Sequence, residues 1–173
     1  RNISIIPMGI NFKPIEKIGK KEKNSLIYVG RLKKSKRVHH IIKTLYFVKK
    51  KIPDVKLYIV GDGDKKYKNY LRRLIKRYHL EKNINFTGYI PSEKRNELMS
   101  KAEVIVVTSV KEGWGLIVTE ANAMGTPAIV YDVDGLRDSV KNNVTGLIVN
   151  PNPNHLSEAV INYLQNNELK IKL

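Results

Sequence analysis

The segment from residue 112 to residue 127 combines glycines and glutamates at a spacing that could bind a phosphorylated sugar. Gly113 and Gly115 form a Gly-X-Gly turn before a short predicted helix, so a phosphate could approach the backbone and meet the free N–H groups at the helix start. Glu112 and Glu120 flank this phosphate site. Carboxylates repel phosphate, but they accept hydrogen bonds from sugar and ribose hydroxyls. The segment therefore predicts a site that binds phosphate and hydroxyl groups together.

Two elements must position these groups. A buried strand is predicted over 102–108, in which 104–107 are continuously apolar, and it delivers the chain to the turn. A short helix is predicted over 116–124, and Gly125 and Pro127 end it. Small residues follow Glu120 and favour close packing of this helix on the sheet, which places Glu120 near the ligand rather than on a solvated helix face.

The same alternation of strand and helix runs through the chain. Apolar, partly β-branched runs predict strands, and apolar residues at helical spacing predict the helices between them. The predicted strands are 26–29, 55–60, 84–87, 102–108, 128–131 and 146–149; the predicted helices are 37–51, 67–79, one opened by Pro91 with Ser92 as its cap, 116–124 and 154–164, with a short segment near 135–141. This alternation predicts an α/β fold, with a parallel sheet covered by helices on both faces.

Turns rich in glycine and charge follow five of the predicted strands. They are 30–31, 61–63, 88–89, 109–115 and 132–135. Ligands of such sheets bind off the carboxyl ends of the strands, so these turns are expected to gather on one edge. Arg31 and Lys36 could there neutralise a diphosphate, Arg31 with a planar fork and Lys36 with a point charge. Each alone would be an ordinary surface cation; beside the glycine-rich helix start, they favour an anion site.

Other chemistries have weaker support in the sequence. The triplets Asp62-Gly63-Asp64 and Asp132-Val133-Asp134 could hold a divalent cation, but aspartate is also ordinary in turns, and no metal site is expected. The histidines have no metal-ligand spacing and are interpreted as structural: His39, His40, His79 and His155. No Gly-X-Gly-X-X-Gly follows the first strand, which disfavours a dinucleotide cofactor. Trp114 could stack on a sugar or shield the site, and shielding is favoured.

The charge of the chain is unevenly distributed. The 173 residues carry a net charge of +16, yet residues 1–100 hold 26 Lys+Arg and 8 Asp+Glu (+18), and residues 101–173 hold 6 and 8 (−2). The basic half could hold a phosphorylated small molecule, anionic lipid or nucleic acid, but no nucleic-acid motif is present and a solvated surface is favoured over a nucleic-acid site. The lack of cysteine fits a cytoplasmic protein, and no apolar run has the roughly 20 residues of a membrane span.

Motifs in a fixed order resemble the C-terminal, nucleotide-sugar donor domain of GT-B retaining glycosyltransferases of family 4, the group 1 type. The resemblance covers nearly the whole chain and rests on Gly30-Arg31-Leu32 with Lys36, Val60-Gly61-Asp62-Gly63, Phe86-Thr87-Gly88-Tyr89, Glu112-Gly113-Trp114-Gly115, Glu120-Ala121, Gly125-Thr126-Pro127 and Gly146-Leu147-Ile148-Val149. It implies a Rossmann-like three-layer α/β/α domain, one half of a GT-B architecture, over residues 1–173. Within it, 1–24 would be an N-terminal segment and loop, and 25–165 the core.

The resemblance also assigns roles. Arg31 and Lys36 would bind the donor diphosphate, Glu112 the hydroxyls of the donor sugar and Glu120 the ribose. Catalytic function would fall to Arg31, Lys36 and Glu112. Amides around Gly115, Leu116 and Ile117 would hold the distal phosphate, the backbone near Tyr89 and Ile90 the base, and Gly30, Gly61, Gly113 and Trp114 would complete the donor site. Three positions depart from the family pattern: Met8 replaces a common Asn, Arg37 a common Gly and Asp134 the first Gly of a usual pair.

The resulting hypothesis is the donor half of an enzyme that moves a hexose from a UDP-, GDP- or ADP-sugar to an acceptor hydroxyl with retention, without cofactor or metal. A preceding domain would hold the acceptor, a glycan or a lipid-linked molecule, and a final helix would follow Leu173; without them this chain is expected to bind nucleotide weakly and turn over little. A peripheral position at the cytoplasmic membrane face remains open. The rival hypotheses are a GT-B-like nucleotide-sugar epimerase or phosphorylase, and a non-catalytic basic module that binds anionic lipid or nucleic acid.

Overall fold

The computed structural model describes residues 20–173, so the apolar run at 3–7 and Met8 lie outside the described residues. Strands and helices alternate as the hydrophobic pattern predicts. The elements are β1 (Glu22–Val29), η1 (Lys34–Lys36), α1 (Val38–Lys49), β2 (Lys56–Val60), α2 (Lys65–Arg77), β3 (Ile84–Gly88), α3 (Ser92–Lys101), β4 (Ala102–Val107), α4 (Leu116–Ala123), β5 (Ala128–Tyr131), α5 (Leu136–Ser139), β6 (Gly146–Val149), α6 (Pro153–Gln165) and α7 (Asn167–Lys172).

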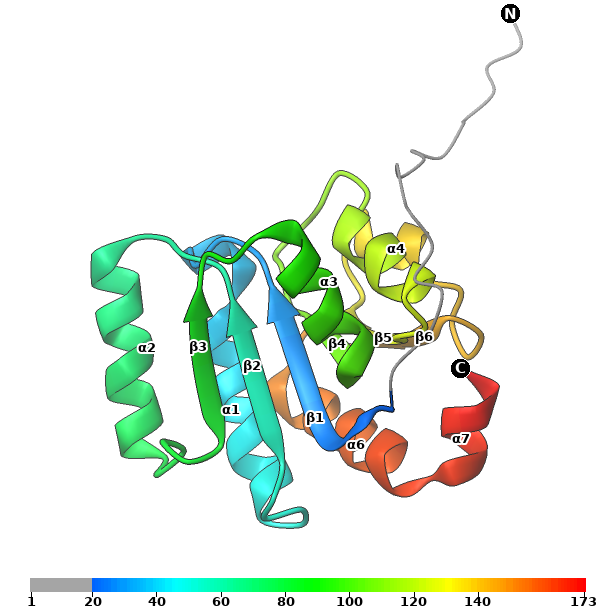
Figure 1. The fold of residues 1–173 in the computed structure, drawn as a ribbon, viewed down its shortest axis with the longest axis horizontal. Coiled ribbons are helices and arrows are strands. Elements are labelled where there is room, and N and C mark those ends of the chain that lie inside the picture. Colours follow the sequence, from blue (N-terminus) through cyan, green and yellow to red (C-terminus); the bar gives the residue numbers. More distant parts are fainter. Residues whose placement is uncertain (1–19) are drawn as a thin grey trace, which may run out of the picture.

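The strands form one six-stranded sheet in the order β3-β2-β1-β4-β5-β6, and every neighbouring pair is parallel (Figure 1). From β1 the chain builds outward to β2 and β3, then returns to place β4 on the other side of β1. This reversal is the point at which the loops beyond the strands diverge and leave room for a ligand. The predicted Rossmann-like parallel α/β fold is confirmed.

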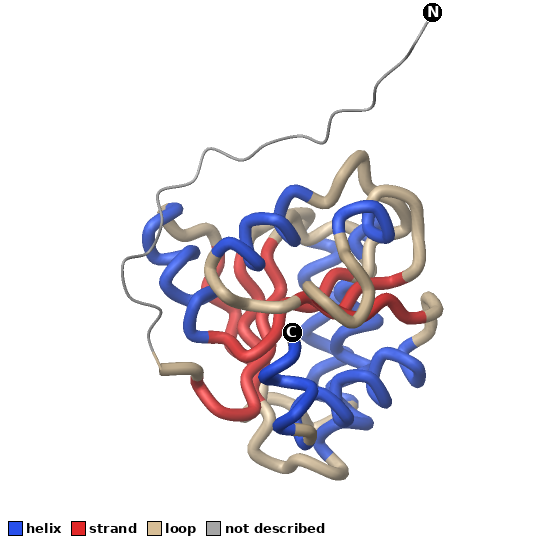
Figure 2. The backbone as a smooth tube through the Cα atoms, turned by 90° about the vertical axis from the view of Figure 1, so that its right-hand side faces the viewer, coloured by secondary structure: helices blue, strands red, loops and turns tan. Residues whose placement is uncertain are grey.

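Helices cover both faces of the sheet (Figures 1 and 2). Because successive strand residues point to opposite faces, Leu26 and Tyr28 pack in the core shared with α1, α2 and α6. Ile27, between them, packs in the second core with α3, α4 and α5. All six residues of β4 are buried, as expected for a strand covered on both faces.

The beginning of β1 differs from the prediction. Polar residues 22–24 were predicted as a loop, but the strand starts at Glu22, with a register shift against β4 before Leu26. The side chain of Glu22 accepts hydrogen bonds from Lys56 Nζ at 2.6 Å and Tyr58 Oη at 2.7 Å, both on the neighbouring strand β2. A polar segment therefore becomes a strand because its side chains find polar partners across the sheet.

Two helices also differ from the prediction. Ser92 is the first residue of α3 rather than its cap; Pro91 stands at the N-cap and makes no side-chain hydrogen bond. The short helix α7 was not predicted, and it begins where Asn166 Oδ1 accepts a hydrogen bond from the backbone N–H of Leu169 at 3.0 Å. None of the helices in residues 20–173 has the length and apolar character needed to cross a membrane.

Candidate functional site

Two adjacent cavities lie at the carboxyl edge of the sheet, on either side of the turn after β1. The larger cavity has a volume of about 510 Å³ and lies between the ends of β1 and β4 and the start of α4. The smaller cavity, of about 290 Å³, lies between the ends of β1, β2 and β3. Four residues line both: Val29, Gly30, Arg31 and Arg95.

Every residue predicted for the site lines one of these cavities. The larger cavity is lined by Gly30, Arg31, Lys36, Glu112, Gly113, Trp114, Gly115, Leu116, Ile117 and Glu120. The smaller cavity adds Gly61, Tyr89 and Ile90. A third hollow, of about 480 Å³, lies between β6 and α6 and contains none of the predicted residues and no lysine or arginine. The predicted constellation is therefore brought together at a single edge, while the roles of its members are still predictions.

Glu112 lies in a small polar cluster in the loop after β4. Its Oε1 forms an ion pair with Lys36 Nζ and accepts a hydrogen bond from Ser109 Oγ at 2.5 Å. The side chains of Lys36 and Glu112 are 22% and 19% exposed, so both can still meet a ligand. Ser109, only 1% exposed, was not predicted; its place three residues before Glu112 at a strand end was the available signal. The cluster presents a positive and a negative group next to each other.

Backbone contacts tie the turn that carries Lys36 to the end of β4. The side chain of Thr108 donates to the backbone oxygens of Lys36 and Arg37, at 3.0 and 3.1 Å. The N–H of Val110 donates to the oxygen of Ser35 at 2.9 Å. Arg37 has φ +49°, in the left-handed region, which explains why glycine suits this position better. The Lys36–Glu112 pair is thus held by two loops distant in sequence.

Of the two glycines beside Glu112, Gly115 has a packing role that the sequence did not predict. Gly115 precedes α4 with φ +76°, and an added Cβ would lie 3.0 Å from Leu136 and Ser139 of α5. Gly115 is therefore needed for its backbone conformation and for contact with α5. At Gly113 an added Cβ would meet nothing within 4 Å, so that position is open. In the first turn of α4, the N–H of Val118 donates to the oxygen of Gly115 at 2.8 Å, whereas the N–H groups of Leu116 and Ile117 precede the first intrahelical bonds. That turn carries no acidic residue, so it can receive an anion.

The turn after β1 is fixed from below by Tyr28, another residue that the sequence did not suggest. Tyr28 is 1% exposed, lines the larger cavity, and donates from its hydroxyl to the backbone oxygen of Arg31 at 2.9 Å. Burial raises the pKa of the Tyr28 hydroxyl, so it stays protonated and keeps donating. The Arg31 side chain, by contrast, is exposed at the border of the two cavities. The backbone of Arg31 is thus fixed, while its guanidinium remains accessible to a ligand.

Glu120 and Arg95 form an ion pair in the lining of the larger cavity. Glu120 lies on α4, Arg95 on α3, and Arg95 Nη2 is 3.1 Å from Glu120 Oε2. Arg95 was missed because it stands in a run of polar helical residues with no distinctive spacing. Tyr89, at the rim of the smaller cavity, is 85% exposed, and Trp114 is partly buried, which leaves both of its predicted roles open.

The two Asp-X-Asp triplets engage in internal contacts. Asp62 pairs with Lys68 at 2.5 Å, and this hydrogen bond lowers the pKa of the Asp62 carboxyl. Asp64 caps α2 by accepting from the backbone of Tyr67 at 2.8 Å. Asp132 and Asp134 both contact the guanidinium of Arg137, at 2.9 and 3.4 Å. Residues 20–173 contain no group of three or more His, Cys, Asp or Glu side chains that could hold a metal ion.

Two of the histidines interpreted as structural sit at the start of α1, where each contacts a tyrosine. His39 Nδ1 lies 2.9 Å from Tyr67 Oη, and His40 Nδ1 lies 2.9 Å from Tyr131 Oη. Burial, with nearby cations and His39, lowers the pKa of His40 to about 4. Neither histidine lines the two cavities, so this pair belongs to the packing between α1, α2 and the sheet.

Comparisons with known proteins agree with this geometry. The family described as Glycosyl transferases group 1 matches residues 11–173. An uncharacterized glycosyltransferase of Methanocaldococcus jannaschii is 32% identical over 153 residues, which cover 87% of this chain and 38% of that protein. The alpha-D-kanosaminyltransferase of Streptomyces kanamyceticus is 26% identical over 159 residues, which cover 91% of this chain and 41% of that protein. This chain thus spans about two fifths of the length of these relatives.

Solved structures show the same fold. The S. aureus protein TarM, crystallised with fondaparinux, alpha-GlcNAc-glycerol and UDP, superimposes with a TM-score of 0.82 at 25% identity, over 93% of this chain and 32% of TarM. The chain therefore belongs to the glycosyl transferases group 1 family, and its sheet and helices have the fold of a GT-B glycosyltransferase domain.

Proposed function

We propose that this chain is the donor-binding half of a retaining glycosyltransferase that moves a hexose from a nucleoside diphosphate sugar to an acceptor hydroxyl. The observation that carries the proposal is the Lys36–Glu112–Ser109 cluster beside the first turn of α4. A carboxylate next to a diphosphate is repelled unless a cation stands nearby, and Lys36 supplies that cation. Glu112 can then accept hydrogen bonds from sugar hydroxyls while Lys36 faces the phosphates.

The order of residues along the edge fits the order of groups in a nucleotide sugar. Lys36 and Glu112 lie in the larger cavity, and Arg31 lies where the cavities meet. Tyr89 and Ile90 line the smaller cavity. We assign the sugar to Glu112, the diphosphate to Lys36, Arg31 and the α4 amides, the ribose to Glu120, and the base to the backbone near Tyr89. Arg31 and Lys36 would stabilise the charge on the departing diphosphate, and positioning would supply the rest of the catalysis.

The donor is a UDP-, GDP- or ADP-sugar in this proposal. A UDP-sugar is the first candidate, because TarM was crystallised with UDP. No metal or cofactor is assigned. The acceptor, a glycan or a lipid-linked molecule, would bind a second domain that lies outside residues 1–173, so we expect this chain alone to bind the donor weakly and to transfer little sugar. An epimerase or phosphorylase would use the same donor edge, and the second domain would decide between them.

A thermal-shift series with UDP-, GDP-, ADP- and dTDP-glucose tests the donor assignment, because a ligand that binds the native state raises the melting temperature. One nucleotide should stabilise the 173-residue chain selectively. Lys36→Met should abolish that shift, whereas Lys34→Met removes the same charge from an exposed site on the same 3-10 turn and should preserve it. Equal loss in both variants, or no shift with any nucleotide sugar, would contradict the proposal.

A second surface supports a peripheral position on an anionic membrane. The outer face of α2 is lined by Lys66, Asn69, Arg72, Arg73 and Lys76 around an open hollow of about 650 Å³. The helix contains no acidic residue, and these cations are exposed. A cationic face of this kind is attracted to anionic lipid headgroups. We propose it as the contact surface for a membrane that carries a lipid-linked acceptor.

Vesicle sedimentation tests this surface. The chain should sediment with phosphatidylglycerol vesicles and not with phosphatidylcholine vesicles, and Arg72→Glu with Arg73→Glu should remove the binding while leaving the nucleotide-induced thermal shift intact. Binding to phosphatidylglycerol that survives the double substitution would contradict the assignment to α2. Tighter binding to single-stranded DNA than to the vesicles at equal salt would favour the nucleic-acid hypothesis instead.

A further inference from the structure

Arg95 occupies a position that no role in the donor site yet explains. It is the fourth residue of α3, and its side chain, 28% exposed, reaches the carboxyl edge of the sheet. It lines the larger and the smaller cavity, as do Gly30 and Arg31. A guanidinium at this border would lie next to the nucleoside if the base occupies the smaller cavity and the diphosphate the larger one.

The contacts of Arg95 are unusual for a simple ion pair. Its Nε and Nη2 atoms donate to Oδ1 of the neighbouring Asn96 at 3.2 and 3.1 Å. Nη2 is also 3.1 Å from Glu120 Oε2, yet Oε2 is buried and receives no well-aligned hydrogen bond from any group in residues 20–173. Asn96 therefore fixes the guanidinium, which compensates the charge of Glu120 while leaving the hydrogen-bonding capacity of Oε2 unused.

A buried carboxylate oxygen without a well-aligned hydrogen bond is costly, and such groups are retained at functional sites among other places. Glu120 is 26% exposed and lines the larger cavity, so a hydroxyl group can reach its carboxylate. Without Arg95, the Glu120 side chain would be free to turn toward solvent and away from the cavity. The ion pair with Arg95, at 3.1 Å, holds the carboxylate in place.

We propose that Arg95 is a positioning residue that sets the selectivity of the donor site for ribose. It holds Glu120 so that the exposed part of the carboxylate can accept hydrogen bonds from the 2′ and 3′ hydroxyls, and the site therefore rejects nucleotides that lack them. The inference rests on the proposed function, because it takes the ligand of Glu120 to be the ribose of a nucleoside diphosphate. A role limited to joining α3 to α4 would give stability without such selectivity.

The test compares UDP with 2′,3′-dideoxy-UDP by chemical-shift titration of the 173-residue chain, a method suited to weak binding. The unchanged chain should prefer UDP by about tenfold or more, since a site built for hydroxyls leaves its acceptors unpaired with the analogue. Arg95→Met should reduce that preference to about threefold or less, mainly by weakening UDP binding. Arg95→Lys should restore part of the preference. Arg77→Met removes the same side chain from an exposed position in the last turn of α2 and should leave the preference unchanged.

The affinity ratio separates the competing explanations. Equal weakening of both nucleotides in Arg95→Met would mean that Arg95 contacts phosphate or only supports the fold, and it would overturn the proposal, as would an unchanged ratio. Glu120→Ala should remove the preference by itself, and adding Arg95→Met should then change the ratio no further. If Arg95→Met does not fold, Asn96→Ala, which frees the guanidinium, should lower the ratio. Failure of the unchanged chain to bind UDP, GDP or ADP would instead refute the proposed function, and this inference with it.

Discussion

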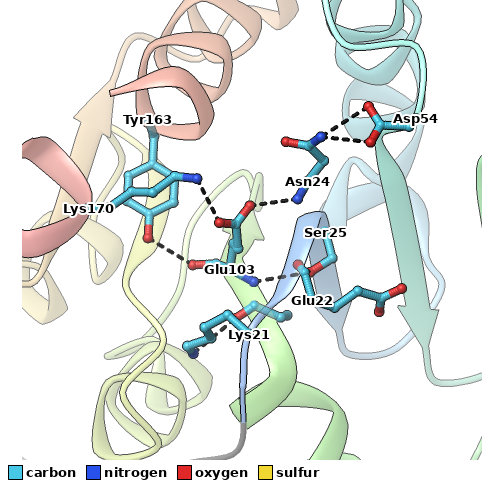
Figure 3. A network of polar contacts seen from close by, with 9 residues as sticks. Lys21, Glu22, Asn24, Ser25, Asp54, Glu103, Tyr163 and Lys170 are labelled. Atoms are coloured by element: carbon cyan, nitrogen blue, oxygen red, sulfur yellow. Dashed lines mark hydrogen bonds and ion pairs between the residues drawn. The ribbon is translucent and has the colours of Figure 1, made fainter. Parts of the chain in front are cut away.

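The glutamates at the two ends of strand β4 differ in how fully their carboxylates are hydrogen-bonded within the protein. Glu103, at the start of the strand, is saturated with internal partners (Figure 3). Its carboxylate accepts hydrogen bonds from the N–H of Asn24 at 2.7 Å and from Lys170 Nζ at 2.6 Å. Its backbone oxygen accepts from Tyr163 Oη at 3.0 Å, and its N–H donates to Ser25 Oγ at 3.2 Å. These contacts tie β1, α6 and α7 to the amino end of β4.

Beyond the carboxyl end of the same strand, the glutamates have carboxylate oxygens that could accept further hydrogen bonds. Glu112 has Lys36 and Ser109 as side-chain partners on one oxygen, and Glu120 has an oxygen that receives no hydrogen bond. Their side chains are 19% and 26% exposed, compared with 10% for Glu103. One end of the strand thus uses a carboxylate for stability, and the other leaves two carboxylates partly exposed, at the edge where ligands of parallel sheets bind.

Replacing Glu103 should have the largest effect on stability. Glu103→Ala leaves the Lys170 ammonium and the Asn24 N–H without their acceptor, and removing one partner of a buried ion pair is strongly destabilising. Because Lys170 is 21% exposed, we expect a loss of about 3 kcal/mol in the free energy of unfolding, at the low end for buried pairs. Urea denaturation measures it.

The control for Glu103→Ala is Glu97→Ala. Glu97 pairs with Lys101 on the surface of α3, where its side chain is 60% exposed, and its loss should leave the free energy of unfolding nearly unchanged. Equal losses in the two variants would show that the amino-end network adds nothing to stability and would remove the contrast between the two ends of β4.

Replacing Glu112 should reverse this pattern, with a large effect on binding and a small one on stability. Glu112→Ala should weaken binding of UDP-glucose by about tenfold, because hydrogen bonds between a carboxylate and sugar hydroxyls are lost. UDP alone should bind within about twofold of the unchanged chain if its binding does not use Glu112. Titration calorimetry measures both ligands, and Glu97→Ala again controls for the lost charge. Equal weakening of UDP and UDP-glucose would contradict the assignment of Glu112 to the sugar.

A smaller effect is expected from Ser109, which orients Glu112 through a hydrogen bond of 2.5 Å. Ser109→Ala should weaken binding of UDP-glucose by about threefold, as the loss of one orienting hydrogen bond predicts. Ser139→Ala is a matched control, because Ser139 Oγ donates to the backbone of Leu136 on neighbouring α5. The same titrations measure both variants. If Ser109→Ala leaves binding of UDP-glucose unchanged, Lys36 alone orients Glu112.

The carboxyl edge could be predicted from the sequence because its signals are local. Each strand contains an apolar run, five of the six runs lead into a turn that contains glycine or a charged residue, and parallel strands bring those turns together. Arg95 escaped prediction because nothing distinguishes it from Glu93, Lys94 and Glu97 in the same polar helix. Only the packing of α3 against α4 shows that it meets Glu120.

The amino-end network could not be predicted, because its members are far apart in the sequence and of unremarkable type. Glu103 stands inside an apolar run, and its partners Asn24 and Lys170 lie 79 and 67 positions away. Residues 22–24 have the composition of a loop, yet they form a strand in which Glu22 bonds to Lys56 and Tyr58 and Asn24 bonds to Glu103. Long-range polar pairs leave no periodic signal, whereas the hydrophobic pattern does.

A pH-dependent effect is expected from Lys21, which donates to the backbone oxygen of Ala102 at 2.9 Å and to Thr126 Oγ1 at 2.6 Å at the amino end. Burial lowers the pKa of Lys21 from 10.5 to about 8, although nearby Glu103 acts in the opposite direction. Between pH 8 and 10.5 the unfolded chain therefore holds more protons than the folded one, so the contribution of Lys21 to stability rises with pH in that window. Urea denaturation at pH 7.5, 8.5 and 9.5 should show the unchanged chain gaining stability relative to Lys21→Met, with other titrating groups cancelling in the difference. Parallel pH profiles would mean that the amino end of β4 tolerates the Lys21 charge at no cost.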